Sequence, residues 1–123
     1  MIGYVTLGTS DIKRAAGFYD KIAAELGGAR IMEGENFIAW GTAGGASLGV
    51  IKPYDGKPAS VGNGVMVALN ATDKGQVDRV YKLAMSLGAK DEGAAGPRGD
   101  TFYAAYFRDL DGNKLNIFYM GQS

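Results

Sequence analysis

Reactive side chains are scarce in this chain of 123 residues, which contains neither histidine nor cysteine. The missing imidazole removes the usual general base near neutral pH and the commonest protein ligand of metals. Nucleophiles of the Ser-His or Cys-His kind are excluded for the same reason, and disulfides are excluded by the missing thiols. Carboxylates, phenols and guanidinium groups are the side chains that remain for chemistry.

Four side chains are candidates for proton transfer: Tyr4, Glu33, Glu35 and Tyr103. Each would act as an acid or base if burial shifted its pKa toward neutrality. Nothing in the sequence pairs these groups with one another. Arg98 is a candidate for binding a ligand carboxylate through paired hydrogen bonds, with a solvated surface arginine as the alternative.

Two glycine-containing segments resemble ligand loops but lack the residues that such loops need. Segment 109–113, Asp-Leu-Asp-Gly-Asn, begins like a calcium loop but has neither the sixth-position glycine nor the twelfth-position acid. It predicts a tight hairpin with Gly112 and Asn113 at positive φ. Segment 93–97 lacks the Gly-Lys-Ser/Thr ending of a phosphate loop and predicts a flexible loop.

The elements that position these groups include two helices, predicted from apolar residues at helical spacing. The first has Ser10 as its N-cap and stops at Gly27-Gly28. The second begins near Asp73, which has the spacing of a capping box with Gln76, and stops at Gly88.

Segments rich in β-branched and aromatic residues flank both helices and predict strands. One strand precedes each helix and three follow it. The expected strands are 4–7, 30–33, 37–40 and 47–51 in the first half, and 65–69, 89–92, 102–107 and 114–119 in the second.

The two halves of the chain repeat each other. Val5, Leu7 and Asp11 recur 62 positions later as Val67, Leu69 and Asp73. The repeat predicts an α+β fold of two tandem βαβββ modules, which form a cupped mixed sheet with the helices outside. The first module covers about 1–52 and the second about 62–120, with a Pro- and Gly-containing linker at about 53–61.

Three segments carry a family resemblance over about residues 1–120. They are Tyr-Val-Thr-Leu-Gly-Thr-Ser-Asp at 4–11, Gly-Phe-Tyr-Asp at 17–20, and Tyr-Phe-Arg-Asp-Leu-Asp-Gly-Asn-Lys-Leu at 106–115. With these segments the chain resembles the vicinal oxygen chelate superfamily, which includes glyoxalase I, extradiol dioxygenases and bleomycin-binding proteins. The resemblance implies a homodimer.

The resemblance also implies four positions for metal ligands, usually His or Glu, two in each module. Carried over to this sequence, they fall on Tyr4, Gly49, Met66 and Asn116. None of these side chains is a competent ligand for a hard divalent cation. The sequence therefore predicts no metal site and no cofactor, and it disfavours metal-dependent glyoxalase or dioxygenase chemistry.

Strand alternation assigns faces to the candidate binding residues. The side chains expected to face into the cup are Tyr4, Thr6, Gly49, Ile51, Met66, Ala68, Asn116 and Phe118. Trp40 in the third strand, Arg98 and Tyr103 complete the predicted ligand site, with core packing as the alternative for Trp40. A closed interior filled by these side chains is the alternative for the whole set.

The function expected from this lining is metal-independent binding of a small, largely apolar or aromatic molecule, as in bleomycin-resistance proteins. One alternative is a glyoxalase- or dioxygenase-like enzyme with an atypical or metal-free site. The other is a dimeric structural or interaction module.

Charge and hydropathy exclude several other partners. Lys plus Arg and Asp plus Glu both total 13, so nothing favours nucleic acid or an anionic membrane. The N-terminus lacks the pattern of a signal peptide, and no apolar run approaches the roughly 20 residues of a membrane span. A cytoplasmic location is expected.

Overall fold

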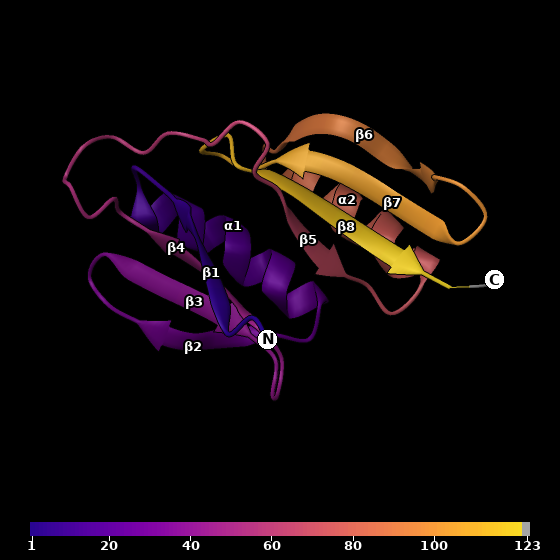
Figure 1. Ribbon diagram of the computed structural model, residues 1–123, viewed down its shortest axis with the longest axis horizontal. Coiled ribbons are helices and arrows are strands. Elements are labelled where there is room, and N and C mark those ends of the chain that lie inside the picture. The colour runs from indigo at the N-terminus through magenta and orange to yellow at the C-terminus, as the bar shows by residue number, and fades with distance from the viewer. Residues whose placement is uncertain (122–123) are drawn as a thin grey trace. The chain divides into compact units, whose positions relative to one another are not determined.

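The computed structural model describes residues 1–121 and folds as two tandem βαβββ modules, which confirms the predicted α+β class (Figure 1). One compact unit covers Met1–Val61 and the other begins at Gly62. The first unit contains β1 (Tyr4–Gly8), α1 (Ile12–Glu25), β2 (Ala29–Glu33), β3 (Phe37–Gly41) and β4 (Ser47–Ile51). The second contains β5 (Val67–Asn70), α2 (Lys74–Ser86), β6 (Lys90–Pro97), β7 (Phe102–Arg108) and β8 (Lys114–Met120).

Both units build the same four-stranded mixed sheet. The strand orders are β1-β4-β3-β2 and β5-β8-β7-β6. In each sheet the first and last strands of the unit pair in parallel, and the other neighbours are antiparallel. The two halves that repeat in sequence therefore also have the same strand order and the same pairing directions.

Helix α1 begins at Asp11, not at Ser10. The Asp11 carboxylate accepts a hydrogen bond from the backbone N–H of Arg14, the usual task of an N-cap. The Ser10 hydroxyl instead accepts one from the backbone N–H of Ala59, so the predicted N-cap was wrong by one residue. The buried side of α1 is formed by Ala15, Ala16, Phe18, Tyr19 and Ile22.

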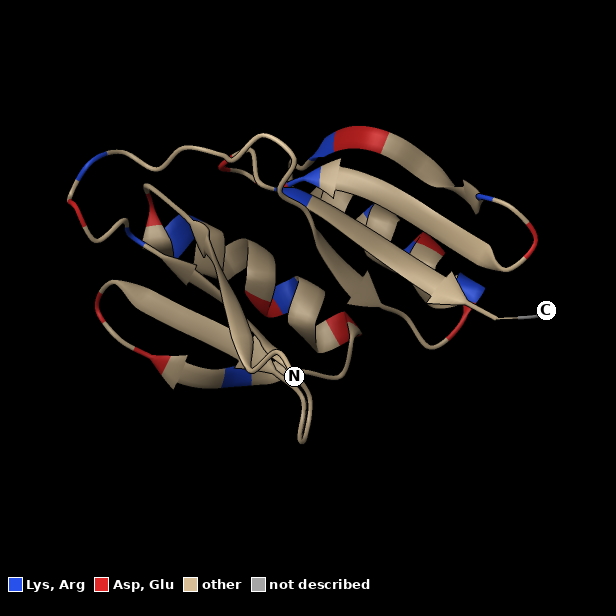
Figure 2. Ribbon diagram, in the orientation of Figure 1, with Lys and Arg blue, Asp and Glu red and all other residues tan. Residues whose placement is uncertain are grey.

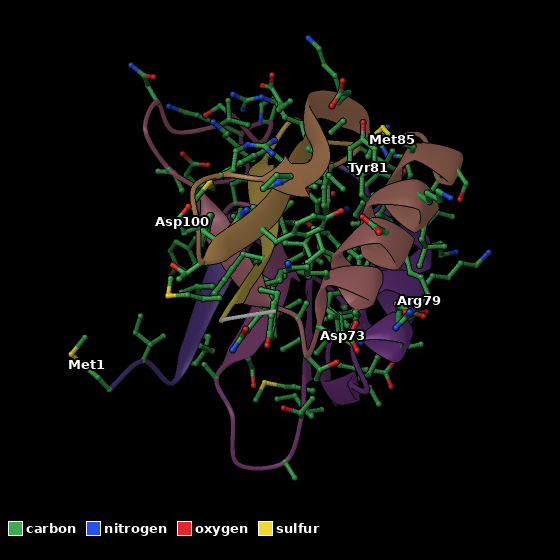
Figure 3. The ribbon with its side chains drawn as sticks, turned by 90° about the vertical axis from the view of Figure 1, so that its right-hand side faces the viewer. Met1, Asp73, Arg79, Tyr81, Met85 and Asp100 are labelled. Atoms are coloured by element: carbon green, nitrogen blue, oxygen red, sulfur yellow. The ribbon has the colours of Figure 1, made fainter. Side chains whose placement is uncertain are left out.

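Helix α2 begins at Asp73, as predicted, and runs along one face of its sheet toward Met85 (Figure 3). Asp73 accepts a hydrogen bond from the backbone N–H of Gln76, and the Gln76 side chain accepts one from the backbone N–H of Thr72. Both helices are followed by glycines with positive φ, Gly27 and Gly88, in the arrangement common at helix C-termini.

Strand β6 is longer than the sequence predicted. It continues to Pro97, so the flexible loop expected at 93–97 was wrong. The pairing with β7 is irregular at Gly93 and again before Gly96, and Gly93 has a φ of 154°. Such bulges let a glycine-rich segment stay in a sheet although it shows no apolar alternation.

The β7–β8 turn is organised by Asp109. Its carboxylate accepts hydrogen bonds from the backbone N–H groups of Asp111 and Asn113, both at 2.9 Å. Gly112 has a positive φ, as predicted, but Asn113 does not, because its backbone and its amide are both held by Asp109. No helix within residues 1–121 is long and apolar enough to cross a membrane.

Candidate functional site

Each sheet has one face covered by the helix of its own unit and a second face that this helix does not cover, here called the helix-free face (Figure 1). Two hydrogen bonds from strand side chains to the helices identify the helix-covered face of each sheet. Trp40 Nε1 donates to Asp20 of α1 at 2.8 Å, and the Tyr103 hydroxyl donates to Asp78 of α2 at 2.7 Å. Because side chains alternate along a strand, their neighbours lie on the helix-free faces.

The helix-free face of the first unit carries the predicted residues Tyr4, Thr6, Gly49 and Ile51. Tyr4 pairs in register with Ser47, and Thr6 pairs with Gly49. Tyr4 is 65% exposed. These residues therefore share one face of their sheet, on which Tyr4 and Thr6 are exposed and Gly49 is buried.

Phe37, which the sequence analysis did not select, covers the centre of that surface. Its ring lies so close to Gly49 that a Cβ added there would be 2.6 Å from Phe37 Cε1. The Tyr4 and Phe37 rings meet edge to face with centroids 6.4 Å apart. Phe37 thus fills the space that a side chain at position 49 would need.

The helix-free face of the second unit carries Ala68, Asn116 and Phe118. Ala68 pairs with Asn116 across β5 and β8. Phe118 stacks on Phe102, with centroids 5.5 Å apart and the rings inclined by 19°. Met66 precedes β5, is 41% exposed, and lies outside the strand in which it was expected.

The Asn116 amide is engaged by its own sheet. The residue is 1% exposed, and Nδ2 donates to the carbonyl oxygens of Ala105 and Ile117. A buried amide held in this way stabilises the pairing of β7 and β8.

Trp40 and Tyr103 lie on the helix-covered faces, apart from the other candidates of their units. Trp40 is 3% exposed and packs on Tyr19 with ring centroids 5.5 Å apart, as the core-packing alternative described. The hydrogen bond to Asp78 raises the pKa of Tyr103, and burial raises it further. Trp40 and Tyr103 lie on the helix-covered faces because strand register determines the face to which each side chain points.

Arg98 lies beside Tyr106, a second residue that the sequence analysis did not select. The guanidinium carbon is 5.7 Å from the Tyr106 ring centroid, and Lys114 Nζ is also 5.7 Å from that centroid. Arg98 donates to the carbonyl oxygens of Ala94 and Gly96 at 2.8 and 2.9 Å. Tyr106 alternates with Phe107, which is buried, so it belongs to the helix-free face.

The candidate acid–base residues are not brought together within either unit. Glu33 pairs with Arg30, which also binds Asp20 of α1. The hydrogen bond from Arg30 holds the pKa of Asp20 below its usual value. Glu35 lies exposed between β2 and β3. This ion-pair network sits at the edge of α1, away from Tyr4 on the opposite face.

The four positions implied for a metal do not fit one. Gly49 has no side chain and its space is taken by Phe37, the Asn116 amide is used by backbone carbonyls, and Tyr4 and Met66 are poor ligands for hard divalent ions. Among residues 1–121, no group of three or more His, Cys, Asp or Glu side chains could hold a metal ion.

A four-stranded mixed sheet with a helix on one face, built twice in tandem, defines the class of paired βαβββ proteins. The sequence model of the Glyoxalase/Bleomycin resistance protein/Dioxygenase superfamily matches residues 1–117. The chain belongs to this superfamily. No curated protein matches it significantly.

Solved structures agree with this assignment. A glyoxalase/bleomycin resistance protein from Albidiferax ferrireducens is 28% identical, with a TM-score of 0.91 over 98% of this chain and 99% of that chain. A family enzyme from Burkholderia phytofirmans is 20% identical, with a TM-score of 0.78 over 97% and 98%. A lactoylglutathione lyase from Agrobacterium tumefaciens is 21% identical, with a TM-score of 0.71 over 97% and 92%. At these last two identities the likeness shows the fold alone.

Proposed function

We propose that this protein binds a small, largely apolar or aromatic molecule on the helix-free faces of its sheets, without a metal. The observation that carries the proposal is the Phe37 ring over Gly49, which puts an aromatic surface where the family resemblance implies a metal ligand. The family relative from Albidiferax ferrireducens, described as a glyoxalase/bleomycin resistance protein, is consistent with a binding function.

Exposed apolar side chains on both helix-free faces support the proposal. Met32 is 56% exposed and pairs with Ala39, which lies on the face that carries Phe37. Met120 is 62% exposed and pairs with Phe102. Each methionine lies next to an aromatic ring of its own unit, and aromatic rings add a preference for planar ligands.

The methionine methyl groups provide a direct test. The chain has five methionines, of which Met32, Met66 and Met120 report on the proposed surface. Met85 in α2 and the exposed N-terminal Met1 serve as internal controls. In a ¹³C-methyl spectrum titrated with a library of neutral aromatic compounds, we expect saturable shifts at one or more of the three reporters and none at the controls. A spectrum unchanged throughout the library would contradict the proposal.

A dimeric interaction module is the second candidate, and the same exposed apolar side chains favour it. In that case a second copy of the chain would cover Tyr4, Met32 and Met120, which are all more than half exposed.

We also propose the homodimer that the family resemblance implies. Native mass spectrometry tests it: a dimer whose mass falls to the monomer in Tyr4→Lys supports this role, and a monomer at all concentrations excludes it.

A further inference from the structure

Three cationic residues stand in a row across the second sheet. Lys90 of β6 pairs in register with Arg108 of β7, which pairs with Lys114 of β8. Figure 2 shows the corresponding blue segments gathered at one end of the sheet. Like charges directly opposite one another destabilise a sheet, so this row is a feature that strand pairing alone does not explain.

One carboxylate offsets the row. Glu92 forms an ion pair with Arg108, whose hydrogen bond is the main reason that the pKa of Glu92 is lowered, with smaller contributions from Lys90 and Lys114. Asp91, the other acid of this stretch, accepts a hydrogen bond from Tyr81 of α2 and so lies on the helix-covered side. Among Lys90, Glu92, Arg108 and Lys114 the charges therefore sum to an excess of positive charge, in a chain whose net charge is zero.

A fourth cation, Arg98, follows the far end of β6, and its guanidinium reaches back to Tyr106, two residues before Arg108 on the same face. The glycines of β6 make room for it, since a Cβ on Gly93 would be 3.3 Å from one Arg98 nitrogen and 3.2 Å from the Tyr106 ring. The Tyr106 ring is thereby within the range of cation–π attraction to both Arg98 and Lys114. In the part of the chain that the structure describes, neither Arg98 nor Lys114 forms an ion pair with a carboxylate.

An apolar surface adjoins these cations on the same face. Phe118 pairs with Ala104, and Tyr106 is two residues further along β7, a distance of about 7 Å along a strand. A planar molecule of two fused rings has about this length. It would lie on the Phe102–Phe118 stack and reach the cations with a substituent at one end.

We propose that the ligand of this face is an organic oxyanion, with a planar apolar body on Phe102 and Phe118 and a carboxylate or phosphate group held by Arg98 and Lys114. This inference rests on the proposed function and adds the chemical class of the ligand. Nη1 of Arg98 donates to the carbonyl oxygens of Gly96 and Pro97, and Nη2 donates to that of Ala94. The guanidinium would therefore offer the oxyanion its remaining N–H groups as charge-assisted donors, and the lysine adds a point charge.

The test compares three probes of one shape by calorimetry at low salt: 2-naphthoate, 2-naphthyl phosphate and the neutral 2-naphthalenemethanol. We expect at least one anion to bind about tenfold more tightly than the alcohol, a preference that shrinks at high salt because exposed charges are screened. Arg98→Gln and Lys114→Gln should each reduce that preference about threefold or more. Lys82→Gln removes the same charge from exposed α2 surface and should leave it unchanged.

The outcomes separate the two proposals. Tighter binding of the carboxylate or of the phosphate supports the inference and identifies the oxyanion. Equal binding of all three probes, or a preference that both glutamine variants retain, overturns the inference and leaves the proposed function standing. Failure of all three probes to bind contradicts both. Circular dichroism and the affinity for 2-naphthalenemethanol verify that the variants are folded.

Discussion

At the scale of single residues, a missing side chain shapes the candidate site as much as those present. Gly49 was recognisable from the sequence as a position without a metal ligand, because the family resemblance implies a ligand there. The ring that fills its space was not, since Phe37 comes from the neighbouring strand and its rotamer depends on packing. Tyr106 was missed for the same reason, because its cationic neighbours are Arg98, which follows β6, and Lys114 of β8.

Replacing Gly49 with alanine should destabilise the first unit. The new Cβ would meet the Phe37 ring at 2.6 Å, and overpacking of this kind costs about 1–3 kcal/mol. Urea unfolding should show this loss, and adding Phe37→Leu should recover part of it. The control is Gly17→Ala, in α1, where an added Cβ meets nothing within 4 Å. There a gain of about 0.5–1 kcal/mol is expected. Equal effects at both glycines would show that Phe37 does not occupy the site.

Asp20 should contribute stability that depends on pH. The hydrogen bond from Arg30 lowers its pKa in the folded protein from the ordinary 3.8. The stabilisation is therefore present above about pH 4 and is lost as the pH falls through the folded value. Asp20→Asn should lower the free energy of unfolding by roughly 1 kcal/mol at pH 7, as for a partly exposed ion pair. The gap between wild type and variant should close toward pH 2, and a gap of constant size would contradict this account.

At the scale of helices and strands, the sequence predicted nearly everything that depends on periodicity and capping. Both helices, the glycines at which they stop and the order of the strands along the chain follow from the local spacing of apolar, capping and turn residues. The first N-cap was misplaced because Ser10 and Asp11 are both good capping residues, and the contact of Ser10 with Ala59 is far away in sequence. The extent of β6 was missed because a strand containing Gly93 and Gly96 has no apolar alternation to recognise.

The N-caps of the two helices should be energetically similar. Asp11 and Asp73 each accept a hydrogen bond from the backbone N–H three residues later, at 3.1 and 2.7 Å. Replacing either with alanine should lower the free energy of unfolding by about 1 kcal/mol, whereas Lys82→Ala on the surface of α2 should change it little. Chemical denaturation measures all three. A loss at Asp11→Ala below a few tenths of a kcal/mol would return the capping role to Ser10.

At the scale of the whole molecule, the repeat and three short motifs were enough to predict the superfamily, and the match over residues 1–117 confirms it. The ligand site was only partly predictable. Seven of the candidates lie on the helix-free faces, but Met66 lies outside β5, and Trp40 and Tyr103 are on the helix-covered faces. The two-residue alternation of side chains along a strand separates two faces but does not say which face the helix covers. The hydrogen bonds from Trp40 to α1 and from Tyr103 to α2 identify the covered face.

Metal independence is the central claim, and it is tested most directly by the methyl titration with a bound aromatic compound, repeated with and without divalent metal. Protein dialysed against a chelator should contain no stoichiometric metal by elemental analysis and should still show saturable shifts at Met32, Met66 or Met120. Added zinc or manganese should leave the dissociation constant unchanged. Shifts that vanish after chelation and return with the metal would contradict the account.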